Sequence, residues 1–205
     1  MDSSTMRAIG VQGGKGTADA LFVEEVEKPS PAAGQILVRV KAAGVNRPDI
    51  AQREGNYPPP PGASEIIGLE IAGEVAELGD GASRWAIGDN VVALLPGGGY
   101  AEYAVVDERH ALPAPDNMDL ATAAALPETV YTVWTNLFER GGLKAGETVL
   151  IHGANSGIGA TAIHMAKAAG AKVIATARGA DKAKRALDVG ADISIDATKE
   201  DFAER

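Results

Sequence analysis

The sequence predicts an α/β protein in which an N-terminal β-rich domain is followed by a doubly wound parallel sheet. Two changes of pattern along the 205-residue chain lead to this fold class. Up to about residue 115, short apolar runs are separated by proline and glycine turns, which is typical of an antiparallel, barrel-like β domain. After residue 117, apolar strands alternate with longer helical segments, the pattern of a parallel sheet covered by helices.

The first part carries five apolar runs of strand length. They are separated by turn residues such as Pro58–Pro61 and Gly97–Gly99. Short runs that are rich in β-branched residues and end at such turns favour strands over helices. The expected strands are Leu21–Val23, Ile36–Lys41, Ile71–Leu78, Val91–Leu95 and Tyr103–Val106.

Two helices open the second part. Asp119–Leu126 is expected to stop at Pro127, and Thr129–Arg140 ends before a pair of glycines. We therefore expect domains at residues 1–118 and 119–205. The remaining elements alternate as strand, helix, strand, helix and strand, over Thr148–His152, Gly157–Ala169, Lys172–Ala177, Asp181–Val189 and Asp192–Ile195.

Composition and charge exclude several classes of protein. The formal net charge of -9 argues against partners such as nucleic acid or an anionic membrane surface, and no apolar stretch is long enough to span a membrane. The first residues lack the pattern of a signal or transit peptide, so the expected compartment is the cytoplasm. The absence of cysteine excludes disulfides, thiolate catalysis and cysteine-containing zinc sites.

The stretch Leu150–Gly159 predicts a phosphate-binding turn between a strand and a helix. The three glycine slots of the G-x-G-x-x-G pattern fall on Ala154, Ser156 and Gly159, so small residues stand wherever a side chain would collide with phosphate. A glycine-rich helix start without a ligand is the alternative. The candidate cofactor-binding residues of the turn are Gly153, Ala154, Ser156, Gly157, Ile158 and Gly159.

Basic residues at the end of the next strand indicate which dinucleotide is bound. NAD sites usually carry an acid there for the ribose 2′-hydroxyl, whereas this chain has Arg178, with Lys182 one helical turn on. Asp181 lies beyond the strand and is expected to begin the helix. Arg178 and Lys182 can pair with a 2′-phosphate, so the expected cofactor is NADPH. The alternative is that both are solvated residues at the start of a helix.

Five motifs follow one another in a fixed order: Ala43–Asp49, Tyr57–Pro60, Gly68–Gly79, Gly88–Val91 and Gly98–Tyr103. Together they resemble the medium-chain dehydrogenase/reductase superfamily, and most of all its zinc-free, zeta-crystallin-like quinone oxidoreductase branch. The resemblance runs from about Met6 to Phe202. It implies a GroES-like catalytic domain, a Rossmann domain and a substrate cleft between them.

Short-chain dehydrogenases share only the spacing of glycines in the turn. Their turn lies close to the N-terminus, whereas here about 150 residues precede it, and no Tyr-x-x-x-Lys pair follows Gly159. In zinc-dependent relatives the first ligand, a cysteine, would fall on Asn46, and the histidine of Gly-His-Glu would fall on Leu69. Neither side chain suits Zn²⁺, and His110, His152 and His164 are scattered, so no metal is expected.

Without a metal, the resemblance implies hydride transfer from NADPH to an electrophile that is already activated, a quinone or an α,β-unsaturated carbonyl. The implied catalytic candidates are Asn46, as an amide donor to nicotinamide or carbonyl, Tyr57, as a hydroxyl donor or a wall for a flat ring, and Asp49, which holds the loop. Glu70 and Glu128 are weaker candidates. Purely structural roles in turns and packing are the alternative for each of them.

Two departures from the family pattern bear on function. Asp196-Ala197 stands where relatives carry a tyrosine for the 2′-phosphate. The chain also carries about three strands of a dinucleotide fold that uses about six, so a truncated form is expected, with a homodimer only at full length. A nucleotide-binding or structural module that binds NADPH without turnover is therefore the alternative function.

Overall fold

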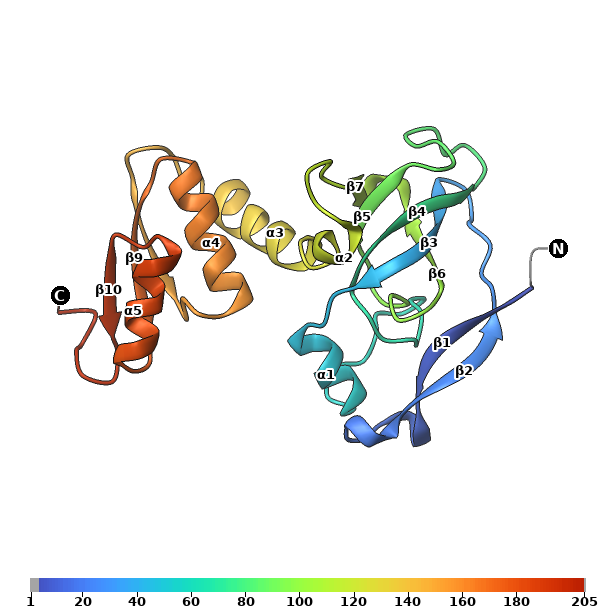
Figure 1. The fold of residues 1–205 in the computed structure, drawn as a ribbon, viewed down its shortest axis with the longest axis horizontal. Helices are drawn as coiled ribbons and strands as arrows, with labels where there is room; N and C mark the ends of the chain where they lie inside the picture. Colours follow the sequence, from blue (N-terminus) through green and yellow to red (C-terminus); the bar gives the residue numbers. More distant parts are fainter. Residues whose placement is uncertain (1–3, 205) are drawn as a thin grey trace. The chain divides into compact units, whose positions relative to one another are not determined.

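The computed structural model describes residues 4–204 and divides into two compact units (Figure 1). Unit 1 ends at Glu128, and unit 2 begins at Thr129. This division lies beyond the expected boundary at 118/119, because α2 (Leu120–Ala123) packs on the β-rich unit through Ala123. The outer ends of the two expected domains, at residues 1 and 205, lie outside the described residues.

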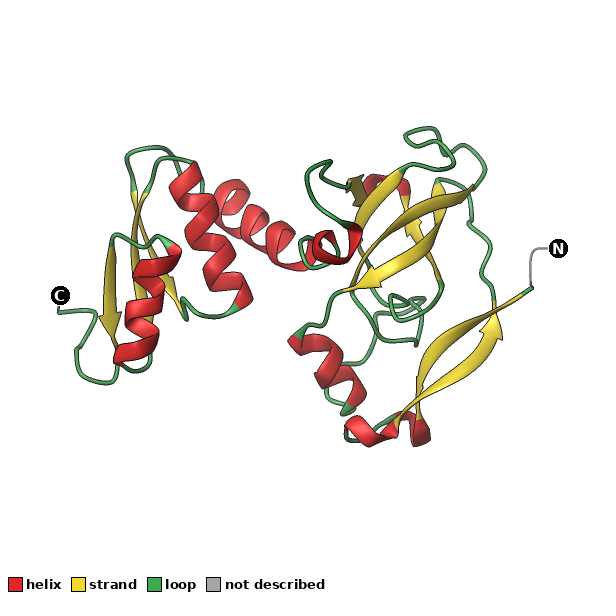
Figure 2. Ribbon diagram, viewed as in Figure 1, coloured by secondary structure: helices red, strands yellow, loops and turns green. Residues whose placement is uncertain are grey.

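Unit 1 is built from antiparallel strands (Figure 2). Five of them form one sheet in the order β6-β3-β4-β5-β7, and β1 pairs with β2 in a separate two-stranded ribbon. The register of β3 on β4 shifts twice, as in a strand that curves to close a barrel-like sheet. The strands are β1 (Thr5–Val11), β2 (Leu21–Glu27), β3 (Gln35–Ala43), β4 (Glu70–Leu78), β5 (Asn90–Leu94), β6 (Tyr103–Asp107) and β7 (Ala111–Pro113).

The alternation of apolar residues along these strands forms the core of unit 1. Ile36 and Val38 on β3, Ile71 and Val75 on β4, and Val91 on β5 are fully buried in one cluster. Residues two apart on a strand point to the same face, so one face of the sheet fills this core. The predicted strands are confirmed, while β1 and β7 are additional to the expectation.

One helix stands where the sequence suggested only a loop. α1 (Arg47–Arg53) begins directly after Asn46, with Pro48 in its first turn, where the missing N–H costs nothing. The Asp49 carboxylate accepts a hydrogen bond from the Asn46 backbone N–H at 2.7 Å. This half of a capping box satisfies a backbone donor at the start of the helix and fixes the Asn46 backbone to its N-terminus.

Unit 2 is a parallel three-stranded sheet with helices. The strand order is β10-β9-β8, and both pairings are parallel. Ile163 on α4 and Val173 on β9 are fully buried in its core. α3 (Pro127–Val133) crosses the boundary between the two units. The other elements of unit 2 are a π-helical segment Trp134–Arg140, β8 (Thr148–His152), α4 (Gly157–Ala168), β9 (Lys172–Ala177), α5 (Ala180–Val189) and β10 (Ile193–Asp196).

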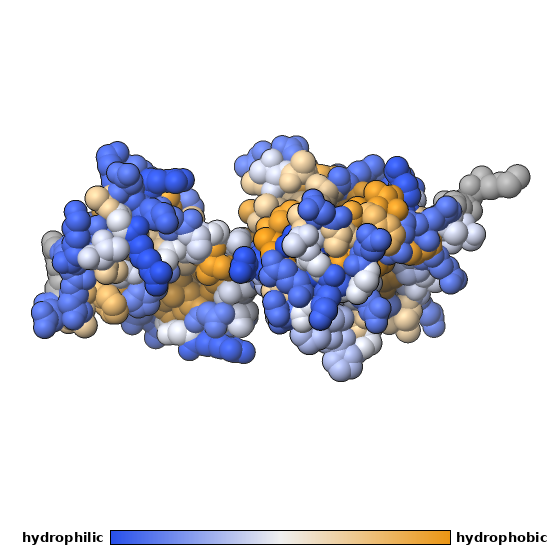
Figure 3. Space-filling view, turned by 90° about the horizontal axis from the view of Figure 1, so that it is seen from below, coloured by the Kyte–Doolittle hydropathy of each residue, from blue (hydrophilic) through white to orange (hydrophobic). Residues whose placement is uncertain are grey.

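The structure thus confirms the predicted α/β class, a GroES-like antiparallel domain followed by a short parallel sheet with helices. Pro127 begins α3 rather than only ending the preceding helix, since proline is well tolerated in a first turn. No helix among residues 4–204 is both long and apolar enough to span a membrane. On the face that Figure 3 shows, hydrophobic patches lie among hydrophilic residues in both units.

Candidate functional site

Unit 2 contains a cavity of about 750 Å³ at the carboxyl ends of β8 and β9. Gly153 and Ser156 line it from the glycine-rich turn, and Arg178 and Lys182 line it from the other side. The structure therefore brings together the two groups that the sequence assigned separately to the cofactor. Ala154 is fully buried beneath the turn.

The turn needs its small residues. Gly153 has a φ of +68°, a left-handed conformation that favours glycine, and a Cβ there would have no atom nearer than 4.0 Å on its open side. A Cβ on Gly159 would overlap the Gly153 carbonyl oxygen and come within 2.9 Å of the Ala154 Cα. Gly159 thus allows the close packing of α4 on the turn, the role of the third glycine in dinucleotide sites.

The start of α4 presents unpaired backbone donors. Ser156 is its N-cap, and its Oγ accepts from the Gly159 N–H at 3.0 Å and donates to the Gly153 carbonyl at 2.9 Å. Within residues 4–204, the N–H groups of Gly157 and Ile158 have no acceptor. Free N–H groups at the positive end of a helix dipole suit an anion, so the turn fits a diphosphate.

Three bases line the cavity, and the sequence analysis named only two of them. Arg185 joins Arg178 and Lys182, and all three are exposed. None makes an ion pair or hydrogen bond with the part of the chain that the structure describes. Lys182 and Arg185 lie three positions apart on α5, so the expected helix already placed them on one face. Their positive charge is left for a ligand.

Asp196 does not face these bases as a competing charge. Its Oδ1 accepts from the Gly179 N–H at 2.8 Å and from the Thr198 hydroxyl at 2.7 Å. These hydrogen bonds, first of all those from Thr198, hold the pKa of Asp196 below its usual value. The carboxylate therefore fixes the loop after β9, while the neighbouring Ala197 lines the cavity without filling it.

An aromatic wall closes another side of the cavity. Phe202 packs edge-on against the His152 ring, with centroids 4.9 Å apart, and His152 Nδ1 lies 3.0 Å from the Thr176 hydroxyl. All three residues line the cavity. Together they form a surface that a flat base could contact.

In unit 1, Asn46, Asp49 and Glu70 belong to one hydrogen-bonded cluster. Asn46 Nδ2 donates to Glu70 Oε1 at 2.8 Å, and the Glu128 backbone N–H donates to Glu70 Oε2 at 2.8 Å. The Tyr100 hydroxyl donates to Asp49 Oδ2 at 3.1 Å. One N–H of the Asn46 amide is thus committed to Glu70, and its oxygen faces the Asp49 backbone N–H in the capping box, which leaves the second N–H for a ligand.

Burial sets the electrostatics of this cluster. Asp49 and Glu70 are each only 2% exposed. Desolvation raises the pKa of both carboxyl groups, although the hydrogen bonds from Asn46 and from the Glu128 backbone act in the opposite direction. A Cβ on Gly44 would overlap Glu70 Oε1, so this glycine is required for the position of the carboxylate. Sequence spacing alone did not reveal this dependence on Gly44.

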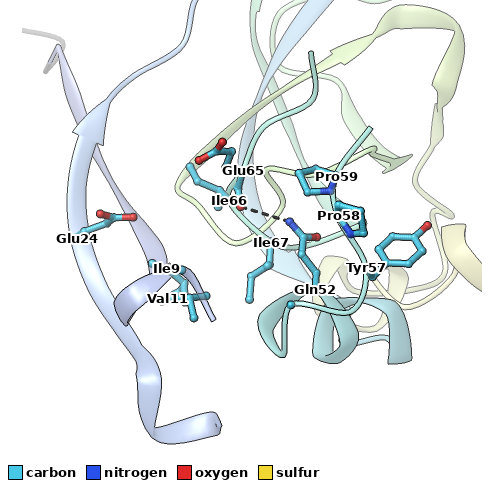
Figure 4. Close-up of a pocket in the computed structure, with 13 residues that line it drawn as sticks. Ile9, Val11, Glu24, Gln52, Tyr57, Pro58, Pro59, Glu65, Ile66 and Ile67 are labelled. Atoms are coloured by element: carbon cyan, nitrogen blue, oxygen red, sulfur yellow. Dashed lines mark hydrogen bonds between the residues drawn. The ribbon is translucent and has the colours of Figure 1, made fainter. Parts of the chain in front are cut away.

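Tyr57 is not part of that cluster. It is 45% exposed and lines a different cavity of unit 1, of about 580 Å³, beside Pro58 and Pro59 (Figure 4). The structure therefore groups Asn46, Asp49 and Glu70 but places Tyr57 elsewhere within unit 1.

Comparisons with known proteins identify the family. Two family models match: the alcohol dehydrogenase GroES-like domain over residues 32–116 and the zinc-binding dehydrogenase over residues 157–205. Quinone oxidoreductase of Rattus norvegicus is 35% identical over 187 residues. The crystal structure of quinone oxidoreductase from Pseudomonas syringae pv. Tomato DC3000 matches with a TM-score of 0.84 at 35% identity, over 98% of this chain and 61% of that one. This chain belongs to the medium-chain dehydrogenase/reductase superfamily.

Within the superfamily, the chain falls in the quinone oxidoreductase branch. It spans 57% of the length of the rat protein, and the match covers 91% of this chain. A mycocerosic acid synthase-like polyketide synthase of Mycobacterium tuberculosis is 33% identical, over 93% of this chain and 9% of that protein. Membership of the superfamily implies a nicotinamide cofactor, for which the cavity of unit 2 provides a fitting turn.

The residues at the family's metal position are poor zinc ligands. Asn46 offers an amide already bonded to Glu70, and Leu69 is apolar. Among the described residues, no group of three or more His, Cys, Asp or Glu side chains is arranged to hold a metal ion. The donor set of this chain therefore does not fit the zinc site that the name of the second family model suggests.

Proposed function

We propose that this protein binds NADPH in the cavity of unit 2 and transfers a hydride from it to a quinone or an α,β-unsaturated carbonyl. The observation that carries the proposal is the set of three unpaired bases, Arg178, Lys182 and Arg185, in the same cavity as the glycine-rich turn. NADH offers these bases a neutral 2′-hydroxyl, whereas NADPH offers a phosphate that guanidinium groups bind through paired, charge-assisted hydrogen bonds.

The residues of the chain bind and orient in this proposal. The free amides of Gly157 and Ile158 hold the diphosphate, and the bases hold the 2′-phosphate. The nicotinamide supplies the hydride once it is bound. Asn46 donates through its remaining N–H to the nicotinamide or to the substrate carbonyl, and Asp49 holds the start of α1. Tyr57 supplies a hydroxyl donor or a flat wall for the substrate ring.

The proposed reaction does not use a metal. A quinone or enone is already electrophilic, so hydrogen bonds to its oxygen suffice where an alcohol dehydrogenase needs a Lewis acid. The name of a relative supports the choice of a quinone, since the rat protein is a quinone oxidoreductase. The α,β-unsaturated carbonyl is included in the assay because it is likewise already electrophilic. The homodimer, expected only at full length, and the cytoplasmic location stay predictions.

A second candidate function is NADPH binding without turnover. The observation in its favour is the small parallel sheet, which among the described residues consists of β10, β9 and β8. Unit 2 therefore offers few contacts to the nicotinamide half of the cofactor. The same cavity would then serve as a nucleotide-binding or structural module.

Titration of NADPH and NADH tests the cofactor proposal directly. Arg178→Ala should weaken NADPH about tenfold, the effect of losing one charge-assisted bond, and should leave NADH nearly unchanged. Lys184→Ala is the matched control, because Lys184 lies on the same helix but pairs with Asp188 instead of lining the cavity. Equal losses for both cofactors would refute a 2′-phosphate site.

Turnover is measured separately. Loss of NADPH absorbance on addition of a small quinone or enone, unchanged by a chelator, supports the metal-free reductase. NADPH binding with no loss of absorbance assigns the chain to the second candidate function.

A further inference from the structure

The cavity of about 580 Å³ in unit 1 has a lining that the reductase proposal does not use beyond Tyr57 (Figure 4). One wall is the β1–β2 ribbon, which contributes Ile9 and Glu24. The opposite wall is α1 and the loop after it, which contribute Gln52 and Ile67. A volume of this size matches the range of small-molecule sites in proteins, roughly 300–1,000 Å³.

The two walls are fixed to each other by backbone hydrogen bonds. The Ile9 N–H donates to the Tyr100 carbonyl at 2.9 Å, which ties the ribbon to the segment before β6. The Gly16 N–H donates to the Arg53 carbonyl at 2.8 Å, which ties the loop between β1 and β2 to the end of α1. The cavity is therefore formed by the fold itself and not by two loosely apposed surfaces.

Apolar side chains line the middle of the cavity, and acceptors lie around it. Ile9, Ile66 and Ile67 lie between Glu24 on one side and Gln52 on the other (Figure 4). Both charged side chains of the lining, Glu24 and Glu65, are acidic. Neither makes an ion pair or side-chain hydrogen bond within residues 4–204. Such a lining disfavours carboxylates and favours a ligand that donates hydrogen bonds.

Gln52 adds a side-chain acceptor. The residue is 9% exposed, and its Nε2 donates to the Glu65 carbonyl at 3.3 Å. That bond sets the orientation of the amide and leaves Oε1 as the acceptor, for which no partner is present among the described residues. A ligand that carries a hydrogen-bond donor could therefore bond to this oxygen.

Gly10 directs Glu24 toward the cavity. A Cβ on Gly10 would lie 2.6 Å from Glu24 Oε1 and 2.8 Å from the Phe22 ring. The Glu24 side chain therefore lies across Gly10, in a space that any other residue would occupy. Both Gly10 and Glu24 line the cavity.

We propose that this cavity binds a protonated organic amine with a compact apolar body. The ammonium group would donate to the carboxylates and to the Gln52 oxygen, and the body would pack on the isoleucines. A quinone, which has only acceptor oxygens, is a poor match for this lining. Apart from Tyr57, the residues that line this cavity have no role in the hydride transfer proposed above.

Matched indole probes test the proposal on the chain without cofactor. Tryptamine, tryptophol and indole-3-acetate share a ring and differ in carrying an ammonium, a hydroxyl or a carboxylate. Each is titrated while the backbone amide NMR shifts of Ile9, Gln52 and Ile67 are followed. We expect tryptamine to bind best, indole-3-acetate worst, and added salt to weaken tryptamine.

Variants then locate the site. Glu24→Gln and Glu65→Gln should each weaken tryptamine by about threefold, as expected for one exposed ion pair, and Gly10→Ala should do so without removing a charge, because it displaces the Glu24 carboxylate. Glu25→Gln is the control, since neighbouring side chains on a strand point to opposite faces. Absence of tryptamine binding at millimolar concentration overturns the proposal, and so does binding that none of these variants changes.

Discussion

The acidic cluster of unit 1 and the basic cavity of unit 2 use their charged groups in opposite ways. Glu70 is buried, and each of its carboxylate oxygens accepts a hydrogen bond from the protein itself. Arg178, Lys182 and Arg185 are exposed and have no partner within residues 4–204. The Glu70 carboxylate therefore needs no ligand as a partner, whereas the three bases have none in the described protein.

This difference separates charged groups that stabilise the fold from charged groups that are available to bind a ligand. A buried carboxylate that loses its donors costs stability, so changes in the unit 1 cluster should appear first in the free energy of unfolding. Exposed, unpaired bases add little to stability, so changes in the unit 2 cavity should appear in cofactor affinity. The two regions therefore differ in which measurement a substitution changes.

The largest effect is expected at Gly159, where the phosphate-binding turn depends on packing rather than charge. Gly159→Ala places a Cβ against the Gly153 carbonyl and Ala154, and overpacking of this kind costs about 3 kcal/mol. The free energy of unfolding of unit 2 is measured by urea titration in a Trp85→Phe background, because the chain has two tryptophans and Trp134 then reports on unit 2 alone.

Gly157→Ala is the control for this experiment. A Cβ on Gly157 meets only the Thr129 Cγ2, at 3.4 Å, which is an ordinary contact. Equal destabilisation by both alanines would show that helix propensity and not close packing explains the glycines of the turn.

The next effect is expected at Glu70. Glu70→Ala leaves the Asn46 amide and the Glu128 backbone N–H without their acceptor and should destabilise unit 1 by about 2 kcal/mol. Unfolding is followed through Trp85 in a Trp134→Phe background. Glu128→Gln is the control, because it keeps the backbone N–H that Glu70 accepts.

Gly44→Ala tests the same Glu70 carboxylate by steric overlap instead of by removing it. The added Cβ overlaps Glu70 Oε1, so this variant should destabilise unit 1 in the same direction as Glu70→Ala. If neither variant changes the urea midpoint of unit 1, the hydrogen bonds of Glu70 do not hold the fold.

The sequence predicted unit 2 better than unit 1, for a physical reason. The strand–helix alternation and the turn at Gly153 are local patterns, and the parallel order β10-β9-β8 follows from right-handed crossovers. Arg178 and Lys182 could be assigned to the cofactor site from the sequence. They follow β9, and the carboxyl end of β9 lies beside that of β8, where the glycine-rich turn begins. Arg185 could have been found by extending the same helix face by three residues.

In unit 1, the important contacts join residues that are distant in the sequence. The bond from Asn46 to Glu70 spans 24 residues, and the one from Glu128 to Glu70 spans 58. No periodicity encodes such pairs. Asn46 and Asp49 were expected in a loop, because asparagine near a glycine is typical of turns, yet Asn46 caps α1 and Asp49 lies in its first turn. Tyr57 was grouped with Asn46 by resemblance alone, and the fold places it beside a cavity that Asn46 does not line.

A smaller effect is expected for Arg185, the base that the sequence analysis did not name. Arg185→Ala should weaken NADPH by roughly fivefold, the loss of one exposed ion pair, and should leave the urea midpoint of unit 2 unchanged. The affinity is measured by NADPH fluorescence, with Lys184→Ala as the control on the same helix. A loss of stability with no loss of affinity would place Arg185 among the groups that hold the fold.

The smallest effect is a difference in titration between two carboxyl groups. Burial raises the pKa of Glu70, so its folded state binds a proton more tightly than the unfolded chain, and its contribution to stability is lost as pH rises through the folded pKa. Hydrogen bonds from Thr198 and from the Gly179 N–H lower the pKa of Asp196, so its contribution is lost as pH falls through the folded pKa. Carboxyl ¹³C NMR, assigned with Glu70→Gln and Asp196→Asn, should therefore show Glu70 titrating above its ordinary range and Asp196 below. If both carboxyl groups titrate at their ordinary values, burial and hydrogen bonding do not separate the electrostatics of the two units.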